Sequence, residues 1–305
     1  MPKFRLKLFV ITFPILLLLG YTEWFYRHVP NNYTVKKQYI DAHAQEIEVL
    51  LLGDSHCFYG LNPDYFSERT FNLSNISQTI YFDKLLFDKY IDQLPKLRKV
   101  VFCLEYANLS QKDNTQEDLW RKYFYQAFMD LTVPLIQRYD AKQYVLSLNQ
   151  GILKTIKLML RYFSTGSITD CKPNGWGINY TFENRTKPSL SATRRWQQNE
   201  DNSLDFSVNT HRLDSMITVC KQRNMQVFIV LLPVSKAFYH LLNPEKTAKI
   251  KQTCQRFTRQ NPQNVHYLNL LQAPIFSDND FYDADHLNDS GAVKCSRIVN
   301  DFLNK

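Results

Sequence analysis

The sequence predicts an α/β domain built around a parallel sheet. Short apolar runs alternate with segments of helical periodicity, and most of these runs lack the polar–apolar alternation of a strand with one exposed face. Helices that cover both faces of a parallel sheet produce this pattern, with right-handed crossovers between the strands. The runs expected to form strands are 47–52, 70–73, 99–104, 226–232 and 265–270, and the segments expected to form helices are about 81–93, 206–224, 242–260 and 290–303.

The size and charge of the chain limit the classes of protein to which it can belong. It has 305 residues, 44% of them hydrophobic, which is enough for one large α/β domain or two small ones. The net charge of +8 is spread along the chain, and no basic run is long enough to form a nucleic-acid-binding arm. We therefore expect no nucleic-acid partner. A solvated basic surface explains the charge, and attraction to anionic glycans or lipid head groups is the alternative.

The N-terminus predicts a membrane anchor. Basic residues precede an uncharged stretch over 8–22, and three aromatic residues follow at 24–26. A helix over 8–26 would be about 28 Å long, close to the hydrocarbon thickness of a bilayer. Because no small-residue cleavage site follows, we expect residues 1–27 to be an uncleaved single-pass anchor, with the rest of the chain outside the cytoplasm, in the periplasm of a Gram-negative cell. A cleaved signal peptide is the alternative.

Two further parts of the chain are predicted from changes in pattern. Polar residues at 28–45 are expected to form a stalk that leads to a domain at 46–305. Within that domain, 111–205 interrupts the alternation of strands and helices, with helical patterns at about 114–129 and 141–162. We expect an insertion over the carboxyl edge of the sheet, where ligands bind in open α/β sheets. A structural excursion without substrate contact is an equal alternative.

Two segments far apart in the sequence carry the groups of a nucleophilic site. The first expected strand ends in Gly53-Asp54-Ser55, which places a hydroxyl at the carboxyl end of a buried strand. Near the other end of the chain, Asp283 and His286 are three residues apart, directly before the last expected helix. A serine hydroxyl needs an adjacent base, and the base needs a carboxylate that fixes its tautomer. The sequence therefore predicts a catalytic triad of Ser55, His286 and Asp283.

Each of these segments also has a structural interpretation. Asp54 or Ser55 could simply cap the helix that follows the strand, and His286 could be an ordinary surface histidine. Asp285 is a rival to Asp283 as the partner of the histidine. Because it directly precedes His286, we expect its side chain to point away.

Gly53-Asp54-Ser55 and Asp283-x-x-His286 together resemble the SGNH/GDSL hydrolase superfamily. The resemblance covers about 45–110 and 206–305, and leaves 111–205 uncovered. It implies a three-layer, flavodoxin-like α/β fold in which the serine after the first strand is the nucleophile. It also implies that the acid and the base come from the loop before the last helix.

The same resemblance implies an oxyanion hole. Ser77 stands where the family has a glycine in its second motif, and the backbone amide survives that change. In the third motif only Asn108 could supply the side-chain donor. We expect the amides of Ser55 and Ser77, together with Asn108, to hold the oxyanion. The residues expected to contact the substrate are Asn72, His56 and Trp176. Turn capping is an equal alternative for Asn72, and an ordinary loop role for Asn108.

We expect neither a metal nor a cofactor. The sequence Gly-Asp-x-His that ends at His56 also resembles metallophosphoesterases, but these enzymes need further His and Asp ligands in Gly-Asn-His and Gly-His-x-His contexts. The other histidines of the chain lie in neither context. The six cysteines include no CxxC pair and no His/Cys cluster with ligand spacing, so most are expected to be small core residues.

With its single anchor, the chain is similar to exported SGNH-like proteins that attach or remove acyl groups on cell-surface polymers, such as alginate acetyltransferases and the teichoic-acid D-alanylation protein. The similarity implies a serine esterase or O-acyltransferase that acts on an acylated polysaccharide or a similar small ester. Water as acceptor gives hydrolysis, and a glycan hydroxyl gives transfer. The alternative, suggested by the altered second and third motifs, is a catalytically weak or inactive module that binds glycan or a membrane acyltransferase partner. A purely structural anchor protein is a third possibility.

Overall fold

The computed structural model describes residues 2–305, which form two compact units. The smaller unit combines the N-terminal residues up to Lys37 with Leu119–Thr169. The larger unit combines Gln38–Asp118 with Asp170–Lys305. The middle of the expected insertion therefore belongs to the N-terminal unit, and only the two flanks of the insertion belong to the unit that contains the sheet.

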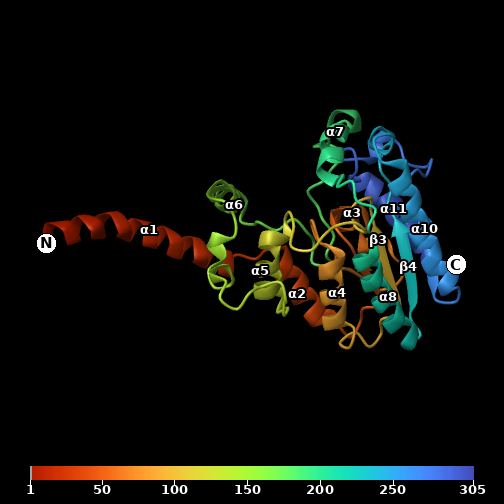
Figure 1. Ribbon diagram of the computed structural model, residues 1–305, viewed down its shortest axis with the longest axis horizontal. Coiled ribbons are helices and arrows are strands. Elements are labelled where there is room, and N and C mark those ends of the chain that lie inside the picture. Colours follow the sequence, from red (N-terminus) through yellow and green to blue (C-terminus); the bar gives the residue numbers. More distant parts are fainter. Residues whose placement is uncertain (1) are drawn as a thin grey trace. The chain divides into compact units, whose positions relative to one another are not determined.

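The larger unit is an α/β fold on a parallel sheet of five strands in the order β2-β1-β3-β4-β5 (Figure 1). Parallel pairing places Leu50 beside Phe71 on one side and beside Val100 on the other. This flavodoxin-like strand order confirms the predicted fold class. The strands are β1 (Val49–Leu52), β2 (Thr70–Asn72), β3 (Lys99–Leu104), β4 (Gln226–Leu231) and β5 (Val265–Asn269), each within a predicted run.

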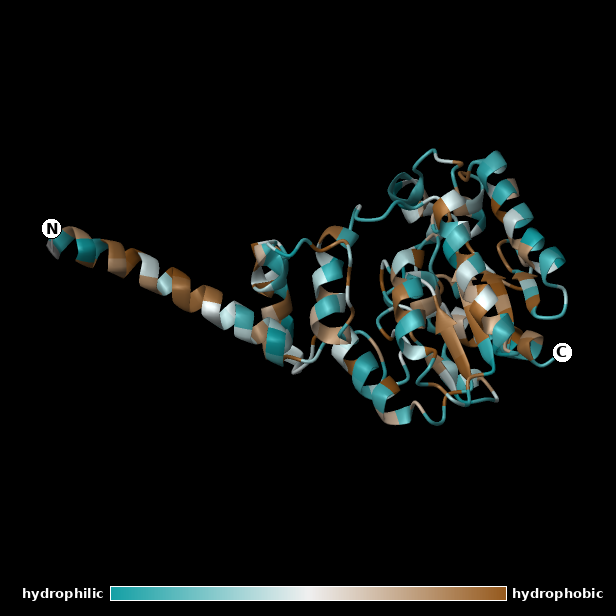
Figure 2. Cartoon of the chain, turned by 60° about the horizontal axis from the view of Figure 1, so that its bottom comes forward, coloured by the Kyte–Doolittle hydropathy of each residue, from teal (hydrophilic) through white to brown (hydrophobic). Residues whose placement is uncertain are grey.

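Helices cover both faces of the sheet, so the unit has three layers. Alternate strand residues point to opposite faces, and Leu51, Val101 and Val230 form one core with Cys57 and Val299. The strands are apolar and are surrounded by helices of mixed character (Figure 2). On the face of this core lie α3 (Ser55–Gly60) and α11 (Asp289–Leu303), and on the other face lie α4 (Ile80–Tyr90), α8 (Ser207–Gln222) and α10 (Pro244–Gln260). The connections of this unit also contain α7 (Pro188–Asn199), α9 (Lys236–Tyr239), η1 (Pro63–Tyr65) and η4 (Asp278–Asp280).

All six cysteines lie in the larger unit, where they are free and buried. Cys57, Cys103 and Cys295 belong to the core between the sheet and the helices α3 and α11. This agrees with the prediction that most of them are small core residues.

The smaller unit is helical and encloses the end of the N-terminal helix. Phe25 is fully buried, and the hydroxyl of Tyr26 lies 2.8 Å from Thr155 Oγ1. The ring of Tyr26 also packs edge-on against Phe124. Figure 1 shows the neighbouring helices beside the end of α1. The elements are α1 (Pro2–His28), α5 (Asp118–Met129), η2 (Ala141–Gln143), η3 (Leu146–Leu148) and α6 (Ile152–Thr165). The second helical pattern of the insertion thus begins at residue 152, later than the expected 141.

Before this buried end, α1 exposes apolar side chains along most of its length. It is long and apolar enough to cross a membrane, and the apolar window is unburied. In Figure 2 the middle of this helix is the most continuous hydrophobic segment outside the sheet unit. One candidate span near the N-terminus fits a single-pass anchor. The polar segment that follows contains helix α2 (Asn32–His43), in which Tyr33 and Lys36 are buried.

The junction of β1 and α3 requires a glycine. Gly53 has φ +143°, and a Cβ at this position would lie 2.8 Å from the carbonyl oxygen of Cys103. Few residues other than glycine adopt such a φ. The amide of Gly53 donates to Asp83 Oδ1 at 3.0 Å, which fixes the turn that presents Ser55.

We expect Gly53→Ala to lower the free energy of unfolding by about 2 kcal/mol or more, because the strain of a positive φ adds to a clash with the backbone of β3. Denaturant unfolding followed by circular dichroism measures the loss. Gly60→Ala is the matched control, since the added methyl group would meet only Leu287 at 3.5 Å. Equal losses for the two variants would contradict this account of the junction.

Candidate active site

The candidate site lies outside the carboxyl ends of β1 and β3, where the strand order of the sheet reverses. Ligands of open α/β sheets bind at such a switch point. A cavity of about 570 Å³ opens there, with Ser55 and Ser77 on its wall. Both flanks of the insertion line it as well, one with Gln111 and the other with Arg195. The predicted contribution of the insertion to this edge of the sheet therefore comes from its flanks.

The three residues of the predicted triad lie in series within hydrogen-bonding distance. Ser55 Oγ is 2.9 Å from His286 Nε2, and His286 Nδ1 is 3.0 Å from Asp283 Oδ1. Asp283 Oδ1 also accepts hydrogen bonds from the backbone amides of His286 at 2.9 Å and Asp285 at 3.2 Å. The loop therefore holds the carboxylate against the imidazole. This is the order of groups that nucleophilic catalysis by serine requires.

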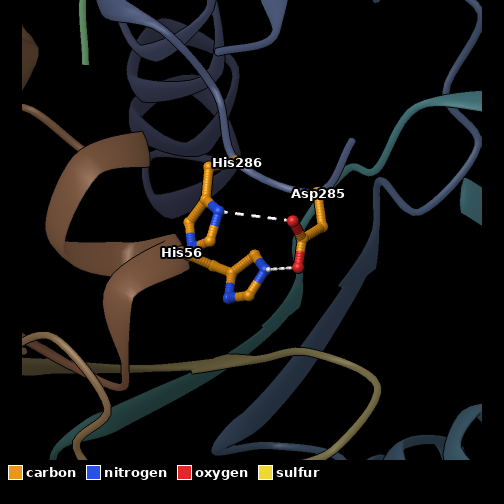
Figure 3. Close-up of side chains that lie close together, drawn as sticks. All are labelled: His56, Asp285 and His286. Carbon is orange, nitrogen blue, oxygen red and sulfur yellow. Dashed lines mark ion pairs between the residues drawn. The ribbon is translucent and has the colours of Figure 1, made fainter. Parts of the chain in front are cut away.

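Asp285 is part of the site, and the expectation that it points away is wrong. Its buried carboxylate lies 3.3 Å from His286 Nδ1 and 3.4 Å from His56 Nε2 (Figure 3). Arg195 holds it through Nε at 2.6 Å and Nη2 at 2.9 Å, and Asn199 donates to it at 2.9 Å. The physical reason is the turn at Asp283, whose carboxylate accepts a hydrogen bond from the amide of Asp285. This turn directs the side chain of Asp285 toward the ring of His286.

Sequence reasoning missed Arg195. It lies on α7, in the part of the insertion that the family resemblance does not cover. The sequence shows it as one of several basic residues in a polar helix, and no motif connects it with a loop 90 residues away. Its role is seen only in the folded chain, where α7 lies beside the loop that carries Asp285.

His56 lies between two carboxylates and stacks on His286. Its Nδ1 is 3.1 Å from Asp54 Oδ1, and the two imidazole rings are 4.3 Å apart and nearly parallel. Asp54 is also the N-cap of α3, because its side chain accepts a hydrogen bond from the amide of His56 at 2.8 Å. His56 lines the cavity, and its contacts with the two carboxylates fix its orientation.

The carboxylates raise the pKa of both histidines. Burial acts to lower the pKa of His56, but Asp54 and Asp285 outweigh it and hold that pKa well above its ordinary value. Burial also acts to lower the pKa of His286, and the carboxylates of Asp283 and Asp285 likewise raise it on balance. Each imidazole therefore keeps its proton to a higher pH than an ordinary histidine does.

Glu105 adds a titratable group to the cavity wall. Burial raises the pKa of its carboxyl group to about 7, with a further increase from the nearby charge of Asp54. It follows β3 directly, and one of its oxygens accepts a hydrogen bond from the amide of Ala107 at 2.8 Å. In the sequence, Glu105 stands three residues before Asn108, in the segment that resembles the third motif of the family.

The residues predicted for the oxyanion hole have different surroundings. Ser77 lines the cavity and has φ +54°, a left-handed conformation that explains why a glycine suits this position. Asn108 is buried, and its amide nitrogen donates to Asp54 Oδ2 at 3.0 Å while its oxygen accepts from the amide of Glu105 at 2.7 Å. Asn108 therefore supports Asp54 and the loop after β3.

Asn72 and Trp176 have structural surroundings, and neither lines the cavity in the described part of the chain. Asn72 is fully buried, and its amide nitrogen donates to the carbonyl oxygens of Cys57 at 3.0 Å and Leu61 at 2.9 Å. Trp176 donates to the carbonyl oxygen of Tyr59 at 2.9 Å. The turn-capping alternative therefore describes Asn72, and Trp176 holds its loop against α3. Substrate contact by these two residues stays a prediction.

Two groups of three side chains are close enough together to hold a metal ion. One contains His56, Asp285 and His286, and the other contains Asp54, His56 and Glu105. Arg195 already neutralises the carboxylate of the first group through two hydrogen bonds. His56 is common to both groups, and its two ring nitrogens already face Asp54 at 3.1 Å and Asp285 at 3.4 Å.

Comparisons with known proteins relate part of the chain to a family. Residues 164–304 match the model of the DltD protein family. None of the curated proteins compared with the chain matches it significantly. A solved structure from Streptococcus pneumonia, provisionally described as a platelet activating factor, has a TM-score of 0.43 and 11% identity over 96% of this chain and 99% of its own. Another from Bacteroides fragilis, provisionally described as an acylhydrolase, has a TM-score of 0.42 and 12% identity over 88% of this chain and 95% of its own. The family match covers the half of the site that carries Arg195 and His286, and it does not extend to Ser55.

We predict that the two histidines respond differently to the loss of each neighbouring carboxylate. Asp285→Asn should lower the pKa of both His56 and His286, since its negative charge faces both rings and stabilises both charged forms. Asp283→Asn should lower the pKa of His286 alone. Titration of the imidazole resonances by NMR measures both values. A pKa of His56 that falls as much in Asp283→Asn as in Asp285→Asn would contradict the arrangement.

Proposed function

We propose that the chain is a membrane-anchored serine enzyme of the SGNH type. It is an ester hydrolase or O-acyltransferase, and its substrate is an acylated cell-surface polysaccharide or a similar ester. The observation that carries the proposal is the 2.9 Å contact between Ser55 Oγ and His286 Nε2, which joins residues 231 positions apart at the ligand-binding edge of the sheet. The match of residues 164–304 to the DltD family supports the same class.

The proposed reaction begins with a proton transfer from Ser55 to His286. Neutral His286 accepts the hydroxyl proton at Nε2 while Ser55 Oγ attacks the ester carbonyl carbon. Asp283 keeps Nδ1 protonated and stabilises the imidazolium that forms. His286 then returns the proton to the leaving alkoxide, and the acyl group remains on Ser55 as an ester.

The second half of the reaction repeats these steps with an acceptor hydroxyl. His286 takes a proton from water or from a glycan hydroxyl, the acceptor oxygen attacks the acyl-enzyme, and the proton returns to Ser55 Oγ. Hydrolysis and transfer therefore use the same groups and differ in the acceptor that the cavity admits. The wall of the cavity is rich in polar side chains, which suits a hydroxyl-bearing acceptor.

The negative charge of the tetrahedral intermediate needs hydrogen-bond donors. We assign this role to the backbone amides of Ser55 and Ser77, which belong to residues that line the cavity. Within residues 2–305 neither amide has a hydrogen-bond acceptor. Asn108 is the third predicted donor, and it would have to exchange its hydrogen bond with Asp54 to contribute.

The hydrogen bond that Asn108 donates to Asp54 also favours a second candidate function. An oxyanion hole made of two backbone amides is weaker than one that includes a side-chain donor. A module of low activity that binds glycan or a membrane acyltransferase partner would tolerate this change. Measurement of turnover separates the two functions.

The proposed location follows from α1. Basic residues precede its apolar stretch, so we place the N-terminus in the cytoplasm and the catalytic unit outside it, in the periplasm of a Gram-negative cell. An acylated glycan of the cell envelope would be accessible from that side of the membrane.

We expect Ser55→Ala to lower the rate of p-nitrophenyl acetate hydrolysis by about 10³-fold or more, because the nucleophile is lost while the fold is kept. The full chain in detergent micelles is assayed, beside Ser67→Ala as a control serine far from the cavity. The rate of the unchanged protein should rise with pH through a value above the ordinary histidine pKa of 6.5, since only neutral His286 accepts the proton. Equal rates for the two serine variants would reject the proposed enzyme.

Ser77→Gly separates a backbone role from a side-chain role. We expect the activity to change by no more than a few-fold, because the amide remains, and the stability to rise by about 1 kcal/mol, because glycine adopts φ +54° without strain. Ester hydrolysis and denaturant unfolding are measured on the same preparation. A loss of activity as large as that of Ser55→Ala would show that the hydroxyl of Ser77, and not its amide, is needed.

A further inference from the structure

Helix α6 exposes an apolar face that the fold leaves uncovered. Its large exposed apolar side chains are between 45% and 74% accessible, and they recur at helical spacing on one side of the helix. They are Ile152, Leu153, Ile156, Leu160 and Phe163, and we call them the α6 apolar face. A continuous patch of this kind marks an interaction site more often than a solvated surface.

The other sides of α6 show how the helix is oriented within its unit. Thr155 and Tyr162 point inward, where Thr155 Oγ1 contacts the hydroxyl of Tyr26 at 2.8 Å and the ring of Tyr162 packs edge-on against Phe25. A third side carries Lys154, Lys157 and Arg161. The helix therefore has one face on α1, one apolar face and one basic face.

The contact with α1 also sets the depth of α6 relative to the candidate membrane span. Phe25 and Tyr26 stand at the end of the apolar stretch of α1, where the head-group region of a bilayer would begin. In Figure 1 α6 is seen nearly along its axis while α1 lies lengthwise, so α6 runs across the direction of α1. A helix in this position would lie parallel to the membrane plane.

The segment of the smaller unit that contains α6 is rich in basic residues and poor in acidic ones. Between residues 119 and 169 there are seven Lys and Arg and two Asp. Tyr144 is exposed, and its carbonyl oxygen accepts a hydrogen bond from Arg27 at 2.7 Å, which keeps it at the end of α1. Exposed tyrosines and basic residues beside an apolar face are typical of interfacial segments that bind anionic lipids.

We propose that α6 is a second membrane contact, an interfacial helix whose apolar face inserts into the head-group region of an anionic lipid bilayer. The inference rests on α1 crossing the membrane, as proposed above. Two contacts hold the smaller unit to the surface, one through the span and one in the plane of the bilayer. The chain leaves this unit twice to enter the sheet unit, after Lys37 and after Thr169.

Site-directed spin labelling tests this proposal on the full chain. The protein is reconstituted in nanodiscs of phosphatidylcholine and phosphatidylglycerol that hold one copy each. A nitroxide is placed at Leu160→Cys on the apolar face, at Lys157→Cys on the basic face, or at Leu16→Cys in the span. The six native cysteines are buried and leave the introduced thiol as the reactive one. All three positions are surface positions, so the fold should be retained.

We expect the label at residue 160 to be accessible to oxygen and protected from a water-soluble nickel chelate, as at residue 16, and the label at residue 157 to show the reverse. A label at residue 160 that is accessible to nickel overturns the proposal, because the α6 apolar face would then not lie in lipid. A partner protein would be the alternative occupant of that face. A label at 160 that is protected from both reagents also overturns it, since protein would then cover the face. A label at residue 16 that is accessible to nickel would show that α1 does not cross the membrane, and it would overturn the proposal for α6 as well. Hydrolysis of p-nitrophenyl acetate by the same samples reports the proposed function independently.

Discussion

A buried carboxylate connects three distant parts of the chain at the candidate site. The carboxylate of Asp285 contacts three side chains. His56 belongs to the segment after β1, His286 is the next residue in the chain, and Arg195 belongs to the insertion. A buried charge of this kind is tolerated only because its partners neutralise it, and removal of one partner would leave the others uncompensated. The orientation of His286 toward Ser55 depends on this balance as well as on Asp283.

The sheet and one half of the site could be predicted from the sequence, because each depends on local pattern. Unbroken apolar runs identify buried parallel strands, and the spacing between Asp283 and His286 places both groups on one short loop. The roles of Asp285 and Arg195 could not be predicted, since they arise where a turn and a helix from different segments meet. The surroundings of Asn72 could not be predicted for a related reason, because a buried amide that donates to two carbonyl oxygens looks the same in sequence as one that contacts a ligand.

The insertion has two physical roles that its sequence does not separate. Its flanks extend over the carboxyl edge of the sheet and supply part of the cavity wall, including Arg195. Its middle encloses Phe25 and Tyr26 at the end of α1 and carries an amphipathic helix. Amphipathic periodicity predicts that α6 has an apolar face, but it gives no information on whether protein or lipid covers that face. The proposal that lipid covers it rests on the contacts that join α6 to the end of α1.

In the proposed reaction, His286 activates Ser55 as a nucleophile. The most direct test of this activation is the reaction of the full chain with a fluorophosphonate, followed by mass spectrometry of the peptides. We expect one adduct, on Ser55, which forms much more slowly when His286 is replaced by glutamine. An unmodified Ser55, or an adduct that forms at the same rate without the imidazole, would contradict it.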